Sequence, residues 1–209
     1  MPPPSQPVVM PPPWWSLERP TPPATVRIAC LLLLVAAACF AVYFLAVMTV
    51  YETVDQVFRD TFSGSDHADT AQTAALVYAV PAVLVLIFGF LLLLLSWGNH
   101  RGSRATRGWT VAFALLGLCC WGTDRMFGEA VRQNADIDEI EQLRAEAVEA
   151  LAGQLPSWYE LVTGTTIMAG LVALFAAAVL LTTPASSKFF RLSGQFAYYR
   201  YQYHPYRPR

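Results

Sequence analysis

The stretch "IACLLLLVAAACFAVYFLAVMTV", residues 28–50, decides the fold class of this chain. Its 23 residues include no charged side chain, and a helix needs about 20 mostly apolar residues to cross the hydrocarbon core of a bilayer. The run is too long for the apolar part of a cleavable signal peptide, 27 residues precede it, and no small-residue cleavage site closes it. The stretch therefore predicts a retained membrane-spanning helix.

Three more stretches are candidates for spans, in a chain that is 55% hydrophobic and only 14% charged. Two of them carry almost no charge, whereas the uncharged part of the third ends at Thr123. The sequence predicts an all-α fold, a four-helix transmembrane bundle with spans over residues 28–50, 74–97, 109–128 and 159–181.

The charges are distributed unequally between the two sides of this bundle. Residues 1–27, the loop 98–108 and the tail after residue 183 carry ten basic residues and one acidic residue, Glu18. The other polar segments carry four arginines and fourteen acidic residues. Because cytoplasmic loops are enriched in Lys and Arg, we expect a plasma-membrane protein with cytoplasmic N- and C-termini, in which residues 51–73 and 129–156 are extracytoplasmic.

Two helical segments are expected outside the membrane. Val54, Val57, Phe58 and Phe62 share one helical face, so the first helix should extend to about Phe62. Residues 136–155 read as a short amphipathic extracytoplasmic helix that starts with a capping-box-like Asp136 and Glu139. Its apolar stripe consists of Ile140, Leu143, Ala147 and Leu151. We expect this stripe to pack against the projecting end of the first helix.

Both ends of the chain are expected to lie outside the bundle, which spans residues 27–183. Ten prolines in residues 1–23 predict a disordered cytoplasmic leader over residues 1–26, with a docking peptide for a partner domain as the alternative. The tail, residues 184–209, mixes arginine with Phe and Tyr. Basic and aromatic residues favour the membrane interface, so we expect the tail to lie along the inner membrane surface rather than to bind nucleic acid.

The ionisable residues near the outer membrane edge form a candidate polar site. Asp124 and Arg125 lie near the end of the third span, and Glu160 lies at the start of the fourth. We favour an ion pair between Arg125 and Glu160 that holds two helix ends together, and keep a transport or proton-relay role as the alternative because ionisable residues in membranes are often functional.

Neither a cofactor nor a metal ion is expected. All four cysteines, Cys30, Cys39, Cys119 and Cys120, lie in apolar stretches. Three thiolates at similar depth would suit a soft metal, but cysteine more often serves as a small apolar packing residue.

Small residues repeat every four positions in the last span, at Thr165, Ala169, Ala173 and Ala177. Such a face lets helix backbones approach closely. We expect it to pack within the bundle, with an interface to another membrane protein as the alternative.

Three pieces of the chain, "MPPPSQPVVMPPPWW", "LPSWYELVTG" and "TTPASSKFFR", resemble segments of four-pass membrane proteins from Actinobacteria that begin with a Pro-rich cytoplasmic leader. The resemblance covers about a fifth of the chain. It implies a bacterial plasma membrane and carries no implication about activity.

No nucleotide-binding, hydrolase or metalloprotease motif is present in the sequence. We therefore expect a non-enzymatic scaffold or accessory subunit, embedded in the lipid bilayer, that associates with other envelope proteins or with itself. The alternative is a small transporter or channel subunit that uses Asp124, Arg125 and Glu160.

Overall fold

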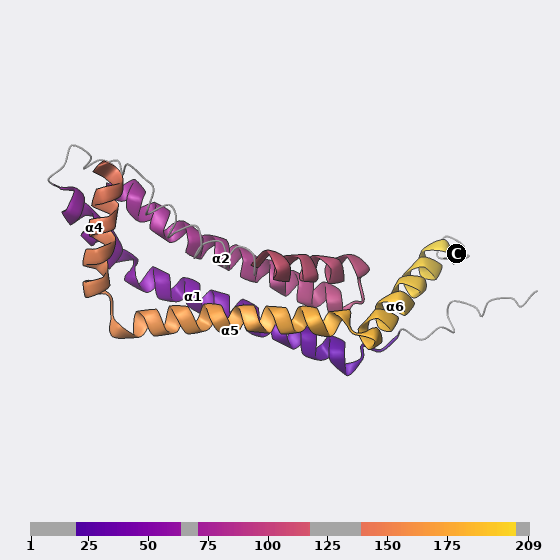
Figure 1. Ribbon diagram of the computed structural model, residues 1–209. Coiled ribbons are helices and arrows are strands. Elements are labelled where there is room, and N and C mark those ends of the chain that lie inside the picture. The colour runs from indigo at the N-terminus through magenta and orange to yellow at the C-terminus, as the bar shows by residue number, and fades with distance from the viewer. Residues whose placement is uncertain (1–19, 64–70, 118–138, 204–209) are drawn as a thin grey trace, which may run out of the picture.

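The computed structural model describes residues 20–63, 71–117 and 139–203, and every regular element in these ranges is a helix. The helices are α1 (Ala24–Phe62), α2 (Ala71–His100), α4 (Glu139–Gln154), α5 (Ser157–Thr182) and α6 (Pro184–Tyr203) (Figure 1). Another helix covers residues 104–117, and the chain beyond it is next described at residue 139. The predicted all-α class is confirmed for these residues.

The 39-residue helix α1 is the element against which the rest of the bundle packs. It begins after Pro23, which is extended, and ends at Phe62, where the Ser63 amide donates to the Asp60 carbonyl. At 1.5 Å per residue it is about 58 Å long, roughly twice the thickness of a bilayer core. The prediction that this helix extends to Phe62 is confirmed, and its projection beyond the membrane stays a prediction.

Two apolar clusters lie along α1. The first joins its N-terminal part to α2, α5, α6 and the helix over residues 104–117, and includes Leu33, Phe40 and Leu174. The second joins its last turns to α4, because Val54 and Phe62 pack in one cluster with Ala147 and Leu151. The predicted contact between the amphipathic helix and the projecting end of α1 is thereby confirmed for its described residues.

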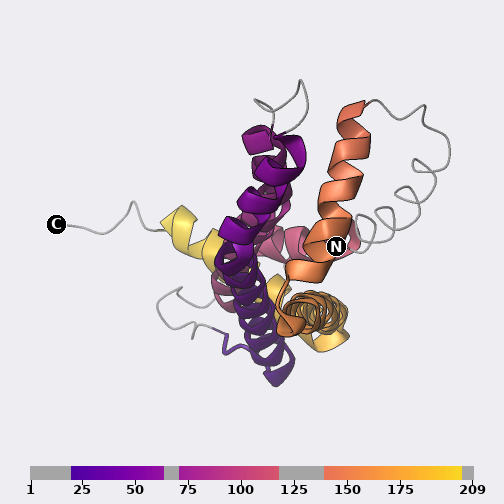
Figure 2. The same ribbon diagram turned by 90° about the vertical axis from the view of Figure 1, so that its left-hand side faces the viewer.

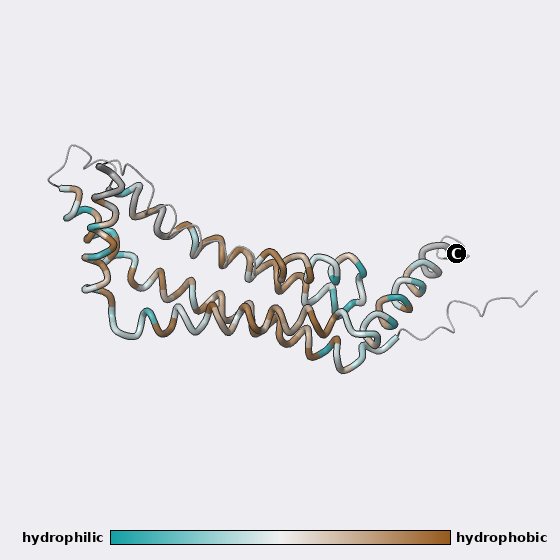
Figure 3. Tube along the Cα trace, in the orientation of Figure 1, coloured by the Kyte–Doolittle hydropathy of each residue, from teal (hydrophilic) through white to brown (hydrophobic). Residues whose placement is uncertain are grey.

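Three helices are long and apolar enough to cross a membrane: α1, residues Ala79–His100 of α2, and α5. Only 33% of the most apolar window of each is buried inside the bundle, so large apolar side chains such as Leu84, Phe90 and Val172 face outward. Figure 3 shows the apolar residues along the middle of these helices and polar residues toward the ends. This surface is that of a membrane protein.

Three of the four expected spans are found among the described residues, and the fourth is described only in part. Of the predicted span 109–128, the structure describes a helix only as far as residue 117. The described part of this helix, residues 104–117, is about 21 Å long and by itself shorter than a core of about 30 Å. Residues 118–128 lie outside the described ranges.

The segment after residue 183 forms α6, a helix that the sequence pattern did not predict. Proline disfavours the helical conformation in the residue before it, and Thr183 is accordingly extended, with ψ of 153°, which ends α5. Pro184 then opens α6, since proline is favoured in the first helical position. The chain turns sharply here, so that α6 leaves the bundle at an angle to α5 (Figure 1).

The bundle has two chemically different ends. At one end, α4 stands across the last turns of α1; at the other, α6 meets the first turns of α1 (Figures 1 and 2). We call the second the basic end; the basic residues there whose side chains the structure describes are Arg27, Arg101, Arg104, Arg107, Lys188 and Arg191. We call the end at α4 the acidic end. The described acidic residues lie there, in the last turns of α1, in α4 and at the start of α5.

Candidate functional site

The basic end is organised by a tight reversal between α2 and the helix over residues 104–117. Gly102 has a φ of 78°, a left-handed conformation that suits glycine, and its amide donates to the Asn99 carbonyl. A Cβ on Gly98 would lie 2.3 Å from Cγ2 of Thr106. Both glycines therefore permit the close antiparallel packing that brings Arg104 and Arg107 to this end.

A buried polar group fixes the register of this reversal. Asn99 is fully buried, and its Nδ2 donates to Oγ1 of Thr110 at 2.8 Å. Thr106 Oγ1 donates to Oδ1 of Asn99 at 3.1 Å. Satisfied polar groups in an apolar environment hold one defined arrangement, so the amide of Asn99 sets the rotation of the second helix and the direction of its arginines.

Hydroxyl groups fix the start of α6. Ser186, fully buried, donates to the Leu180 carbonyl at 2.9 Å and lies 3.0 Å from Oγ1 of Thr25 on α1. Thr183 also contacts Ser186, at 3.1 Å. Phe189 and Phe190 are buried in the first apolar cluster. The first two turns of α6 are thus part of the bundle.

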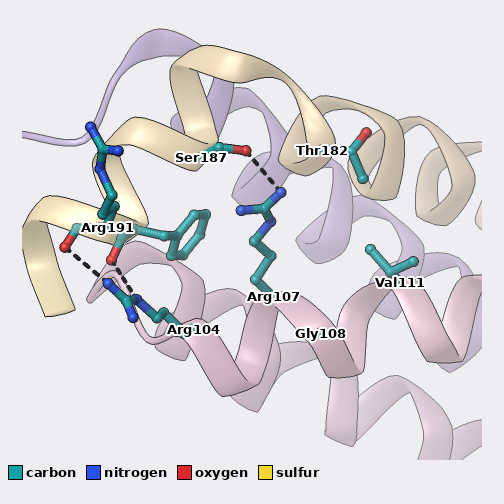
Figure 4. A pocket seen from close by; sticks show the side chains of 8 residues that line it. Arg104, Arg107, Gly108, Val111, Thr182, Ser187 and Arg191 are labelled. Carbon is teal, nitrogen blue, oxygen red and sulfur yellow. Dashed lines mark hydrogen bonds between the residues drawn. The ribbon is translucent and has the colours of Figure 1, made fainter.

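Two arginines join the reversal to α6. Arg104 donates through Nε to the Phe190 carbonyl at 3.3 Å and through Nη2 to the Arg191 carbonyl at 3.2 Å. Arg107 donates through Nη2 to Oγ of Ser187 at 2.9 Å, and its Cζ lies 5.6 Å from the ring centroid of Phe190. Figure 4 shows both guanidinium groups directed toward α6. They hold the helix in place and bring positive charge to its side.

An open groove of about 620 Å³ lies between these elements. We call it the basic groove; it is lined by Arg104, Arg107, Gly108, Val111, Thr182, Ser187, Phe190 and Arg191 (Figure 4). Arg107 comes from one helix and contacts Ser187 and Phe190 from another. A groove with this composition is suited to binding an anion beside an apolar surface.

The positive charge of the basic groove is not neutralised by protein carboxylates in the described part of the chain. The salt bridge that the described residues form, between Arg59 and Asp55 at 2.9 Å, lies far from the groove, in the last turns of α1. The described acidic side chains all belong to the acidic end. Arg101 is a contrast within the basic end, since its Cζ stacks 3.6 Å from the ring centroid of Trp97, outside the groove.

The predicted polar site near the other end is only partly within the described residues. Asp124 and Arg125 lie outside them, so the ion pair between Arg125 and Glu160 stays a prediction. Glu160 is exposed in the first turn of α5. The neighbouring Thr163 and Thr166 hydroxyls donate to carbonyls of their own helix, those of Tyr159 and Val162.

Only half of the predicted small-residue face of α5 is buried in the bundle. Ala173 and Ala177 are buried in the first apolar cluster, whereas Thr165 and Ala169 are exposed. The buried surface instead continues through Gly170, where a Cβ would lie 2.6 Å from Cε1 of Phe40 on α1. The buried face therefore lies at an angle to the predicted one.

Two of the four cysteines, Cys30 and Cys39, lie within the described residues. Cys30 is buried, with Sγ donating to the Ser96 carbonyl at 3.4 Å while Ser96 Oγ donates to the Cys30 carbonyl at 3.1 Å. Cys39 is half-buried, and Cys119 and Cys120 lie outside the described ranges. Within those ranges no three potential ligands gather as a metal site would require.

The basic groove was not predicted from the sequence. The sequence pattern places Arg104 and Arg107 in a loop and predicts a tail along the inner membrane surface, so it does not bring the two together. The available signal was "TTPASSKFF", residues 182–190, in which a proline follows two threonines and precedes two serines and two phenylalanines. This pattern is typical of a helix start with an apolar contact.

Comparison of the chain with protein-family models, with curated proteins and with solved structures finds no match to any of them.

Proposed function

We propose that this chain is a four-pass plasma-membrane protein with cytoplasmic termini, which acts without catalysis by associating with other envelope proteins. The exposed part of the small-residue face on α5 is the observation that carries the proposed association. Thr165 and Ala169 remain exposed on a helix that already contributes Ala173 and Ala177 to the bundle. Small residues on an outward membrane face allow a second helix to pack closely.

The order of the helices supports four crossings rather than three. Helix α1 runs from the basic end to the acidic end, and α2 returns to the basic end (Figure 1). The next helix starts at the basic end with residue 104, but α4 packs on α1 at the acidic end. A fourth crossing between residues 104 and 139, which we propose, would connect these two ends, and α5 then returns to the basic end.

The charge distribution supports the orientation. Basic segments are retained in the cytoplasm during insertion, and the described basic end carries no acidic residue. The same end holds the first turns of α1 and all of α6 (Figure 1). Both termini would therefore lie on the cytoplasmic side.

The association is tested by photocrosslinking in native membranes. A photoreactive amino acid replaces Ala169 in one variant and Val172, an exposed and larger residue, in another, with Ala173 as the buried control. We expect defined crosslinked bands from position 169, containing either a second copy or another membrane protein, and internal crosslinks to α1 from position 173. A chain that yields only lipid adducts from positions 169 and 172 would contradict the proposed association.

A further inference from the structure

The basic groove lies at the level of the bundle where a membrane interface is expected. Trp97 on α2 and Trp109 on the helix over residues 104–117 are both 60% exposed at this end. Tryptophan is enriched at the boundary between headgroups and hydrocarbon. The groove is lined by Gly108 and Val111, which flank Trp109 in the sequence, and by Thr182, the last residue of α5. We therefore place it at that boundary.

The arginines of the groove keep free hydrogen-bonding capacity. A guanidinium group has five N–H donors. Arg107 uses one of them on Ser187, and Arg104 uses two on carbonyls of α6. Arg104 is exposed and Arg107 half-buried, so the remaining donors and both charges are accessible from the groove. The contacts with α6 hold the groups in fixed positions, which lowers the entropic cost of binding an anion.

The lining of the groove combines hydrogen-bond donors with an apolar surface. Arg104, Arg107 and Ser187 provide donors, whereas Gly108, Val111 and Phe190 provide a surface without charge. Val111 is one helical turn further into the bundle than Arg107, in the direction of the exposed Leu115. The polar group of a ligand would therefore meet the arginines while its apolar part continues toward the membrane core.

We propose that the basic groove binds the phosphate headgroup of an anionic phospholipid from the adjacent leaflet. The phosphate would accept hydrogen bonds from Arg107 and Arg104, and the glycerol and upper acyl chain would lie over Gly108 and Val111. Basic pockets between transmembrane helices are a recurrent form of headgroup site. The inference rests on the proposed membrane insertion of α5, and it explains how the uncompensated charge of this end is neutralised.

The test measures phospholipid retained by the purified full-length protein. The protein is reconstituted in nanodiscs of phosphatidylcholine with a minority of phosphatidylglycerol, released into mild detergent, and examined by native mass spectrometry. We expect the wild type to retain phosphatidylglycerol preferentially. Arg107→Gln and Arg104→Gln should each lower that preference about fivefold, as expected for the loss of one cation near an anionic headgroup.

Matched variants distinguish a specific binding site from a general effect of positive charge at this end. Arg101→Gln removes the same charge from the same end but outside the groove, and should retain phosphatidylglycerol like the wild type. Gly108→Trp keeps every charge and places a large side chain where a Cβ meets no atom within 4 Å; it should block retention. Gly153→Trp on α4, an equally open position, is its control.

Three outcomes would overturn the proposal: equal loss in Arg101→Gln and Arg107→Gln, undiminished retention in Gly108→Trp, or displacement of the lipid by inorganic phosphate alone. The last would identify free phosphate as the ligand. If Arg104→Gln does not fold, Arg107→Gln and Gly108→Trp still decide the result. Resistance of the chain to alkaline carbonate extraction and the crosslinks from position 169 are measured separately, so a failure of the proposed function is distinguishable from a failure of the lipid site.

Discussion

Gly170 of α5 lies against the ring of Phe40 of α1, and this contact sets the distance between the two helices. A Cβ at residue 170 would lie 2.6 Å from Cε1 and 3.1 Å from Cδ1 of Phe40. The ring cannot easily move away, because it is buried and its centroid lies 5.8 Å from that of Phe88 on α2. The glycine therefore admits an aromatic side chain at the centre of three helices.

Substitution Gly170→Val should destabilise the bundle by about 1–3 kcal/mol, the usual cost of adding volume to a packed core. The measurement is thermal unfolding of the purified protein in detergent. Gly164→Val is the matched control, because it makes the same change on the same helix where a Cβ meets no described atom within 4 Å. Equal stability of the two variants would contradict the importance of the Phe40 contact.

At this scale the sequence predicted the type of contact but not its position. A repeat of four residues identified Ala173 and Ala177, which are buried. It also selected Thr165 and Ala169, which are exposed, and passed over Gly170. Small residues are frequent on every side of α5, so spacing alone does not define the face; the large partner, Phe40, does so, and its position depends on how two distant helices meet.

Among the elements, α4 is held to the bundle by its contact with the projecting end of α1. Ala147 and Leu151 are buried together with Val54 and Phe58 in the second apolar cluster. The other face of α4 is exposed and carries glutamates such as Glu146 and Glu149. A short helix of this kind is marginal by itself in water, so its order depends on those apolar contacts.

Leu151→Asp should release α4 from α1. Loss of a buried leucine costs about 2–5 kcal/mol, and a carboxylate at this position adds a desolvation cost. We expect faster hydrogen exchange at the amides of α4, with little change in α5. Val148→Asp, at a site that is 44% exposed, should leave the exchange of α4 close to that of the wild type, and similar exchange in both variants would contradict the docking of α4 on α1.

A helix could be predicted from the sequence where its apolar residues recur at helical spacing. Helix α4 and the extension of α1 were predicted because their apolar residues recur at helical spacing between polar ones. Helix α6 was not predicted, because its buried apolar residues in the described range, Phe189 and Phe190, are adjacent and stand among basic and aromatic residues that suit a membrane surface equally well. Its helical form depends on the Thr183–Pro184 break and on hydrogen bonds to Thr25 and Arg104, which come from far along the chain.

For the whole molecule, the separation of charge between the two ends is the feature that sets orientation. The basic end carries six described basic residues outside the last turn of α6 and no described acidic residue, whereas the acidic end carries the described carboxylates. Translocation of cationic segments is disfavoured, so both ends favour the same orientation. The sequence predicted this asymmetry because it depends on which loops carry charge, not on how helices pack.

This orientation predicts opposite labelling of two exposed positions. In a background in which all four cysteines are replaced, Ser63→Cys at the end of α1 and Ala105→Cys after the reversal present thiols at the two ends of the bundle. A membrane-impermeant maleimide applied to intact cells should label position 63 and leave position 105 unlabelled until the membrane is opened. Both sites are exposed, so burial does not account for a difference between them. The reverse pattern would invert the bundle and transfer the basic groove to the outer leaflet, and labelling of both positions in intact cells would mean that the chain between them does not return across the membrane through α2.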